Sequence, residues 1–280
     1  MNQKNHFIIF FFSFFLIISC DKVENPFENM PVSNDTTHQT NDYTRYLLVE
    51  EFTGHTCTAC PDGAREIARL DSIFGKKLIP VAFHAGGFAN PHYPPDTSYL
   101  TDFRTPEGND FFSSYSVWGT PSAMVCRKDD GSGDKVLPKG SWPNAISKLI
   151  NDSAKISIQT TNTFSDLQKQ LISKVKIKWL SDDTGSYKLQ VFLIEDHVID
   201  WQLDGATNIP NYDHRHVFRK SLNGTFGVDL PPPILHDTAT FEYSIQLNNS
   251  WKPADCLIIS VIYHSGTYEV IQANESPVKN

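Results

Sequence analysis

The first half of the chain is organised around the stretch Glu50-Glu51-Phe52-Thr53-Gly54-His55-Thr56-Cys57-Thr58-Ala59-Cys60-Pro61. An apolar run, residues 46–49, leads into this stretch, and a helical pattern over residues 63–74 follows it. The pattern therefore predicts that Cys57 and Cys60 lie where a strand ends and a helix begins. Free N–H groups and the positive end of the helix dipole favour a thiolate there, and a second thiol three residues on can form or release a disulfide.

Length and composition limit the class of protein. The chain has 280 residues, which corresponds to one or two domains, and 40% of them are hydrophobic. The formal net charge is −8 and the sequence contains no run of Lys or Arg, which argues against nucleic-acid binding. Aromatic residues make up 12% of the chain, with Phe and Tyr abundant, and this favours a β-rich fold.

The N-terminus predicts export to the cell envelope. Lys4 precedes an apolar run, residues 7–18, that is too short for an ordinary membrane span and ends in Ser19-Cys20. This ending resembles the lipobox of bacterial lipoproteins, which implies a signal peptide over residues 1–20 and a lipid on the sulfur of Cys20. A short membrane anchor and a plain signal peptide are the alternatives. The mature chain is expected outside the cytoplasm, where disulfides persist, and bound to the membrane through its lipid.

Two folded regions are expected after a flexible tether, residues 21–44. Residues 45–152 alternate between strand and helix patterns, with strands at 46–52, 78–84, 122–127 and 135–138 and helices at 63–74, 105–115 and 141–150. The first strand–helix–strand predicts a right-handed parallel unit, and Pro80 suggests an edge position for the second strand. Residues 153–280 instead show several short alternating runs, which predict an immunoglobulin-like β-sandwich.

The order of elements in residues 45–152, with Cys-x-x-Cys after the first strand, resembles the thioredoxin fold. Gly119-Thr120-Pro121, just before an apolar strand, resembles the cis-proline loop of that fold. The resemblance implies that Cys57 is the attacking thiolate, Cys60 the resolving thiol and Glu51 the general base for Cys60. It also implies that Thr120 and Pro121 bind the partner. The intervening Thr58-Ala59 pair differs from that of thioredoxin, which leaves the direction of electron flow open.

A second resemblance covers most of the mature chain. The matching motifs are Glu50 to Pro61, His84-Ala85-Gly86-Gly87-Phe88, Phe103-Arg104-Thr105-Pro106 and Tyr212-x-His214-x-His216. With these motifs the chain resembles the outer-membrane-protein-28-related lipoproteins of Gram-negative bacteria. That family is defined by location and sequence, so the resemblance implies an outer-membrane lipoprotein and leaves the activity open.

Simpler interpretations of the same residues remain. Cys57 and Cys60 can form a structural disulfide, although so short a loop gains little stability from a cross-link. A zinc site would need more ligands than these two cysteines and His55, and the sequence has no second Cys-x-x-Cys. His214 and His216 would share a face of a strand, which is compatible with a metal site. Cys126 and Cys256 are either buried small side chains or a disulfide between the two domains.

The sequence thus predicts a thioredoxin-like α/β domain followed by an all-β sandwich, in a lipoprotein of the outer membrane. The leading function is thiol–disulfide exchange, without cofactor or metal, on extracytoplasmic protein thiols or with a redox partner protein. The alternative is a non-enzymatic binding or scaffold lipoprotein, in which Cys57 and Cys60 form a structural disulfide.

Overall fold

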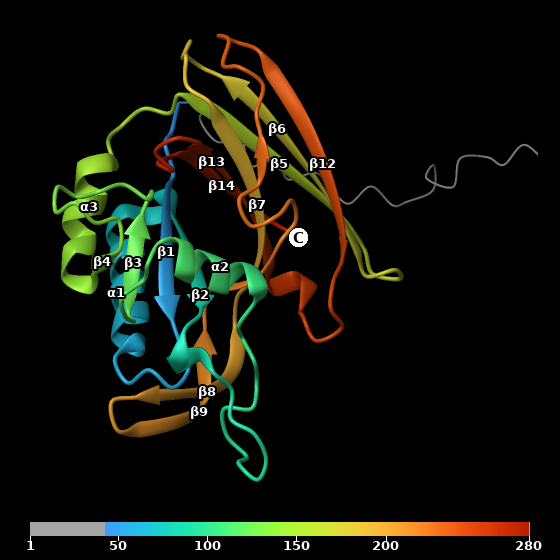
Figure 1. Cartoon of the computed structure of the whole chain (residues 1–280). Coiled ribbons are helices and arrows are strands. Elements are labelled where there is room, and N and C mark those ends of the chain that lie inside the picture. The colour runs from blue at the N-terminus through green and yellow to red at the C-terminus, as the bar shows by residue number, and fades with distance from the viewer. Residues whose placement is uncertain (1–42, 280) are drawn as a thin grey trace, which may run out of the picture. The chain divides into compact units, whose positions relative to one another are not determined.

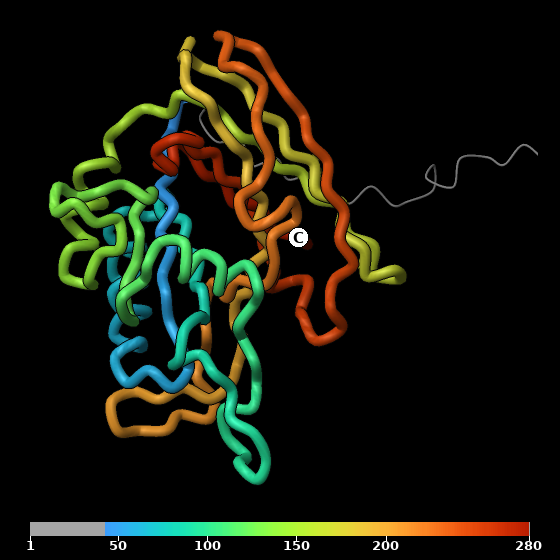
Figure 2. The backbone as a smooth tube through the Cα atoms, in the orientation of Figure 1, coloured from blue at the N-terminus to red at the C-terminus, as the bar shows by residue number. Residues whose placement is uncertain are grey.

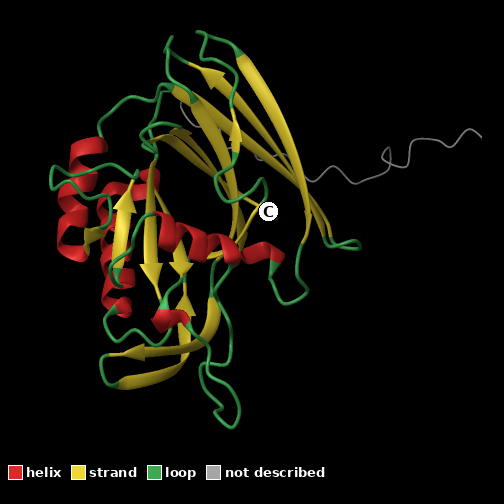
Figure 3. Ribbon diagram, viewed as in Figure 1, coloured by secondary structure: helices red, strands yellow, loops and turns green. Residues whose placement is uncertain are grey.

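The structure is a computed structural model, and it describes residues 43–279 (Figure 1). The predicted signal peptide, the lipidation of Cys20 and most of the predicted tether lie outside these residues. The described chain is β-rich, with several sheets and three α-helices (Figure 3). The helices are α1 (Cys60–Phe74), α2 (Pro106–Ser114) and α3 (Trp142–Leu149).

The predicted parallel unit is confirmed. Strand β1 (Leu47–Thr53) pairs in parallel with β2 (Leu78–His84) in a continuous register, and α1 connects them. All residues of both strands are buried, which explains why they read as nearly continuous apolar runs. Strand β3 (Ser122–Val125) lies antiparallel on the other side of β1 and continues to β4 (Leu137–Pro138), the predicted hairpin.

The second half of the chain consists of strands, as the alternating runs predict. Their bounds are β5 (Ile156–Ser165), β6 (Gln170–Trp179), β7 (Tyr187–Glu195), β8 (Val198–Asp204), β9 (Thr207–His214), β10 (Val217–Ser221), β11 (Val228–Asp229), β12 (Thr238–Gln246), β13 (Cys256–His264) and β14 (Val270–Pro277). They form a three-stranded sheet in the order β12-β6-β5, the two-stranded hairpin β8-β9, and part of a larger sheet.

That larger sheet joins strands from both halves of the sequence. Its main path is β14-β13-β7-β10-β2-β1-β3-β4, with β11 paired to β7. The edge position predicted from Pro80 is wrong, because β2 lies between β10 and β1 in this sheet. Strand β10 meets β2 at a single pair, Val217 with Ala82, so the missing N–H of Pro80 costs little pairing on that side.

Both ends of the described chain also meet. The blue segment that leads into β1 runs beside the red strand β14 (Figure 2). The side chain of Gln272 on β14 donates to the carbonyl oxygen of Thr44 and accepts from the backbone N–H of Tyr46. The hydrophobic core accordingly mixes the two halves. One cluster packs β1, β2, β3 and α3 residues together with Phe192, Phe218 and Tyr263. The other cluster lies between the three-stranded sheet and β7 and β13.

Candidate functional site

The two cysteines at the start of α1 form a disulfide. Each is only 2% exposed. The backbone N–H of Cys57 donates to the carbonyl oxygen of Gly54 at 3.0 Å, which closes a tight turn after β1. Pro61 follows at the first turn of α1, where its missing N–H costs nothing.

The loop before β3 lies against this disulfide. The Sγ atom of Cys57 is 3.6 Å from the carbonyl oxygen of Thr120, and the Thr120–Pro121 peptide bond is cis. The structure therefore brings together Cys57, Cys60, Thr120 and Pro121, which lie about sixty residues apart in the sequence.

Glu51 is buried in β1 and lines a small cavity together with Cys60. Burial raises the pKa of its carboxyl group to about 8. Its Oε1 atom has no hydrogen-bond partner among the described residues. A Cβ atom at Gly63 would lie 2.5 Å from this Oε1 and 2.9 Å from the Cβ of Pro121, so glycine allows α1 to approach both residues.

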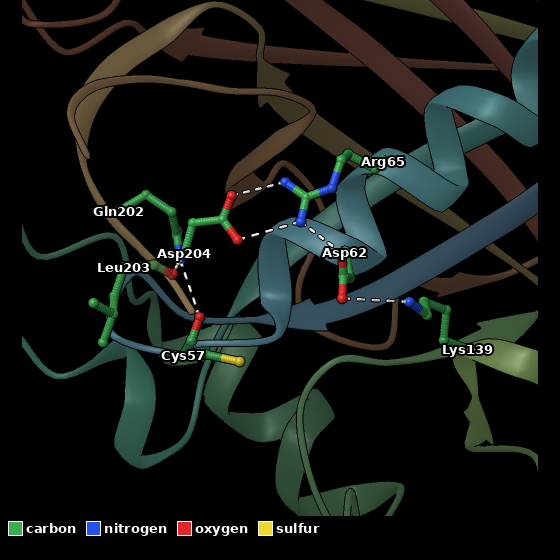
Figure 4. Close-up of polar contacts among 7 residues, drawn as sticks. All are labelled: Cys57, Asp62, Arg65, Lys139, Gln202, Leu203 and Asp204. Atoms are coloured by element: carbon green, nitrogen blue, oxygen red, sulfur yellow. Dashed lines mark hydrogen bonds and ion pairs between the residues drawn. The ribbon is translucent and has the colours of Figure 1, made fainter. Parts of the chain in front are cut away.

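The hairpin β8-β9 holds the other side of the cysteine loop (Figure 4). The backbone N–H groups of Leu203 and Gly205 donate to the carbonyl oxygens of His55 and Thr58, each at 2.8 Å. The buried side-chain amide of Gln202 donates to the carbonyl oxygen of Cys57 at 3.2 Å. The backbone carbonyls of the cysteine loop are therefore paired with a segment about 150 residues further along the chain.

An ion-pair network fixes the tip of the hairpin to α1. Arg65 binds Asp204 through both of its terminal nitrogens, and one of these nitrogens also binds Asp62 at 2.6 Å (Figure 4). Asp62 in turn lies 3.7 Å from Lys139, just before α3. No strand pattern in the sequence predicts this hairpin. The only local signal was Asp204-Gly205, a dipeptide typical of two-residue turns.

An apolar groove opens beside the disulfide. It has a volume of about 300 Å³ and is lined by residues of the loop after β2 and the loop before β3, together with Phe112. Phe88 and Trp118 stand at its rim with 55% and 61% of their surface exposed. The carbonyl oxygen of Phe88 accepts from both the backbone N–H and the hydroxyl of Thr56, the residue before Cys57.

Three buried histidines surround the site. Burial lowers the pKa of His55 and His84, and it lowers that of His214 to about 4, so these imidazoles are neutral at pH 7. The expectation that His214 and His216 share a strand face is wrong. Strand β9 ends at His214, and His216 has a positive φ of 56° in the turn before β10. Among residues 43–279, no group of three or more His, Cys, Asp or Glu side chains is arranged to hold a metal ion.

Cys126 and Cys256 are free thiols, so the structure does not contain the disulfide considered between the two domains. They belong to different hydrophobic clusters. Burial raises the pKa of the Cys126 thiol to about 11 and that of Cys256 to about 12, which suits buried, inert small side chains.

Solved structures resemble this chain at low sequence identity. HBP35 of Porphyromonas gingivalis matches with a TM-score of 0.65 and 14% identity, over 85% of this chain and 77% of its own. A protein from Agrobacterium tumefaciens matches with a TM-score of 0.50 and 10% identity, over 85% of this chain and 96% of its own. These similarities concern the fold alone. A domain of the outer membrane lipoprotein Omp28 from Porphyromonas gingivalis is 22% identical, with a TM-score of 0.32, over 45% of this chain and 89% of its own.

Sequence comparisons and a search for membrane-spanning helices complete the description of the chain. No curated protein sequence is similar enough to this chain to count as a relative. Within residues 43–279, no helix has both the length and the apolar character that a membrane span requires. The family model of outer membrane protein Omp28 matches residues 108–280, more than half of the 280 residues. The chain therefore belongs to the Omp28 family of outer membrane proteins, and it is a protein of the cell envelope.

Proposed function

We propose that this protein is a binding lipoprotein of the outer membrane, which holds an apolar segment of a partner protein in the groove beside Phe88 and Trp118. In this proposal the Cys57–Cys60 disulfide is a structural staple of the groove. The observation that carries the proposal is the hydrogen bonding between the disulfide loop and the groove. Thr56, next to the disulfide, donates to the carbonyl oxygen of Phe88 at the groove rim.

The chemistry of the groove suggests the kind of partner. Its volume of about 300 Å³ is at the small end of the range for ligand pockets. Exposed aromatic side chains at a pocket rim are typical anchors of protein interfaces. The buried disulfide and the hairpin that braces its loop keep one wall of the groove in a fixed position. A rigid apolar groove suits a large apolar side chain of an extended partner segment.

Binding of short extended peptides, with Phe, Leu, Gln or Asp at the central position, tests this proposal. We expect the Phe and Leu peptides to bind and the Asp peptide not to bind. Phe88→Ala and Trp118→Ala should each weaken binding about tenfold or more. Tyr93→Ala is the matched control, because Tyr93 is 70% exposed and does not line the groove. Equal binding of all four peptides would contradict the proposal.

A second function, thiol–disulfide exchange on extracytoplasmic proteins, is favoured by a specific observation. Cys60 and Glu51, whose pKa is raised to about 8 by burial, line the same small cavity, and the carbonyl oxygen of Thr120 lies 3.6 Å from Sγ of Cys57. In this function Cys57 is the attacking thiolate, Cys60 the resolving thiol and Glu51 the acid or base for Cys60. This second function is proposed together with a thioredoxin-like domain over residues 45–152 and a β-sandwich over residues 153–280.

Two measurements separate the functions. A structural staple should have a reduction potential below about −300 mV, whereas a disulfide that exchanges should lie above it. The Cys60→Ser variant should trap mixed disulfides on Cys57 if exchange occurs, and Cys57→Ser is the matched control that should trap none. If the Cys60→Ser protein carries no client in the cell envelope, the exchange function is wrong and the staple remains.

A further inference from the structure

The cavity beneath Cys60 is built by both halves of the chain. Glu51 comes from β1, Cys60 from α1 and His84 from β2, while Gln202, Tyr212 and His214 come from the hairpin β8-β9. Its volume is about 20 Å³. That is close to the space that one water molecule needs, and too little for a larger ligand.

Two buried polar atoms on the cavity lining have no protein partner among the described residues. They are Oε1 of Glu51 and Nδ1 of His84, on side chains that are 4% exposed. A buried polar atom without a hydrogen bond costs free energy, and small polar cavities in proteins hold water that supplies the missing bonds. The shape and the chemistry of this cavity therefore both fit one water.

We infer that one water in this cavity links the Glu51 carboxyl group to the Tyr212 hydroxyl, and that Tyr212 positions this water where Glu51 can regain its proton from solvent. Tyr212 on β9 lines the cavity and is only half-buried, so part of the residue meets solvent. Its ring packs edge-on against His214 at 4.9 Å, which orients it. After burial, the charge of Glu51 is the next cause of the raised pKa of Tyr212, consistent with the closeness of the two groups.

The role of this water rests on the thiol–disulfide exchange function. A client thiolate attacks Sγ of Cys57 and bonds to it, the Cys57–Cys60 bond breaks, and its electron pair leaves on Sγ of Cys60. The Glu51 carboxylic acid gives its proton to that thiolate. The resulting carboxylate takes a proton from the cavity water as that water takes one from solvent beside Tyr212, so that in total one solvent proton ends on the thiol of Cys60. Tyr212 is thus a positioning residue that acts through Glu51.

The other groups that face Glu51 do not replace Tyr212. His84 and His214 are neutral because burial lowers the pKa of each, and Cys60 is in the disulfide. Arg215 is paired with Asp196. On the other side of β1, the residue opposite Glu51 is Ala123. Near Tyr212, Arg65 and Asp204 form an ion pair whose opposite charges largely offset each other.

The test is a carbon-13 NMR titration of the Glu51 carboxyl group in the oxidised full-length protein in detergent. The Glu51 signal is assigned as the carboxyl signal that is missing in the Glu51→Gln variant. Because a hydrogen bond to a carboxylate favours the charged form, Tyr212→Phe should make Glu51 an about tenfold weaker acid, a rise of about one pH unit. Tyr93→Phe, at an exposed tyrosine outside the cavity, should leave the titration unchanged. An unchanged titration in Tyr212→Phe would overturn the inference.

A second measurement does not depend on any variant. The wild-type protein should show magnetisation transfer from a long-lived water to the Tyr212 and Ala82 protons at the cavity, and its absence would also overturn the inference. Both measurements use the oxidised protein. Their results therefore test the water and the role of Tyr212 independently of the exchange function. The exchange function has its own test, the trapping of clients on Cys57.

Discussion

Two neighbouring glutamates meet opposite environments in the same buried strand. Glu50 and Glu51 point to opposite faces of the sheet. Glu50 accepts two hydrogen bonds from Arg127, at 2.6 and 2.7 Å, in a fully buried ion pair. Glu51 has no cationic partner, and burial raises its pKa to about 8, so it is protonated at neutral pH. Arg127 thus compensates the charge of Glu50, whereas Glu51 is uncharged because it holds a proton.

The protonated Glu51 makes stability depend on pH. Its pKa is about 8 in the folded state, and about 4.3 in the unfolded chain. Between these values the folded state binds the extra proton, so stability falls as pH rises. From pH 6.5 to 8, the free energy of unfolding should fall by about 1.6 kcal/mol in the wild type relative to Glu51→Gln. Urea unfolding of the oxidised proteins at both pH values measures this difference.

Glu242→Gln is the control for this experiment, because Glu242 is exposed on β12. It should follow the wild type at both pH values. If Glu51→Gln and the wild type lose stability in parallel over this range, Glu51 is not protonated in the folded protein.

Gly63 is the second residue on which the site depends. In an ordinary helix, glycine to alanine stabilises by up to about 1 kcal/mol. Here the added methyl group would meet the Glu51 carboxyl and the rigid ring of Pro121. Gly63→Ala should therefore destabilise the protein by about 1–3 kcal/mol, measured by urea unfolding. Gly140→Ala, where no atom lies within 4 Å of the new methyl group, should stay close to the wild type.

At the scale of elements, the strands that the sequence predicts are those with a regular pattern of buried residues. The strands that it does not predict have no such pattern. Strands β2, β6 and β12 are either continuous apolar runs or strict alternations, and both signals are local. The strands of the hairpin β8-β9 are largely half-buried or exposed and carry polar residues throughout, so no periodicity marks them. Its position against α1 depends on hydrogen bonds to residues about 150 positions away, which no local pattern encodes.

The candidate site divides in the same way. Cys57, Cys60 and Glu51 lie within ten residues, and resemblance to a known fold was enough to predict that Thr120 and Pro121 join them. The contributions of the hairpin could not be predicted, because they follow from how the second half of the chain folds back onto the first. The division into two domains, at residues 45–152 and 153–280, stays a prediction.

The hairpin yields a prediction that contrasts a buried contact with an exposed one. Gln202 is 2% exposed, and its loss leaves the carbonyl oxygens of Gly54 and Cys57 without this donor. Gln202→Ala should cost about 1–3 kcal/mol of stability. Asp204→Ala removes an ion pair with the half-exposed Arg65, and should cost less than about 1 kcal/mol. Urea unfolding of both variants measures these two losses in free energy of unfolding. Equal losses would contradict the role of Gln202 in holding the cysteine loop.

At the scale of the whole molecule, Arg127 connects the two halves of the sequence. It follows β3, where it pairs with Glu50 of β1, and its guanidinium lies 5.3 Å from the ring of Phe111 and 5.0 Å from that of Tyr263 on β13. A fully buried guanidinium in such a position is costly to leave without its carboxylate. The pair therefore fixes how β13 packs against β1, in addition to the sheet that both strands share.

Removing one partner of this pair should affect both halves together. Arg127→Met leaves Glu50 buried without a counter-charge and should cost about 3–5 kcal/mol, whereas Glu50→Gln with Arg127→Met should recover much of that loss.

Trp142 lies in the cluster of β1 and α3, and Trp179 in the cluster of the three-stranded sheet. Because one sheet contributes to both clusters, denaturation followed at either tryptophan, with the other four tryptophans of the chain replaced by Phe, should give the same midpoint. In Arg127→Met both midpoints should fall by the same amount. Separate midpoints would mean that the halves unfold independently and that the shared sheet does not couple them.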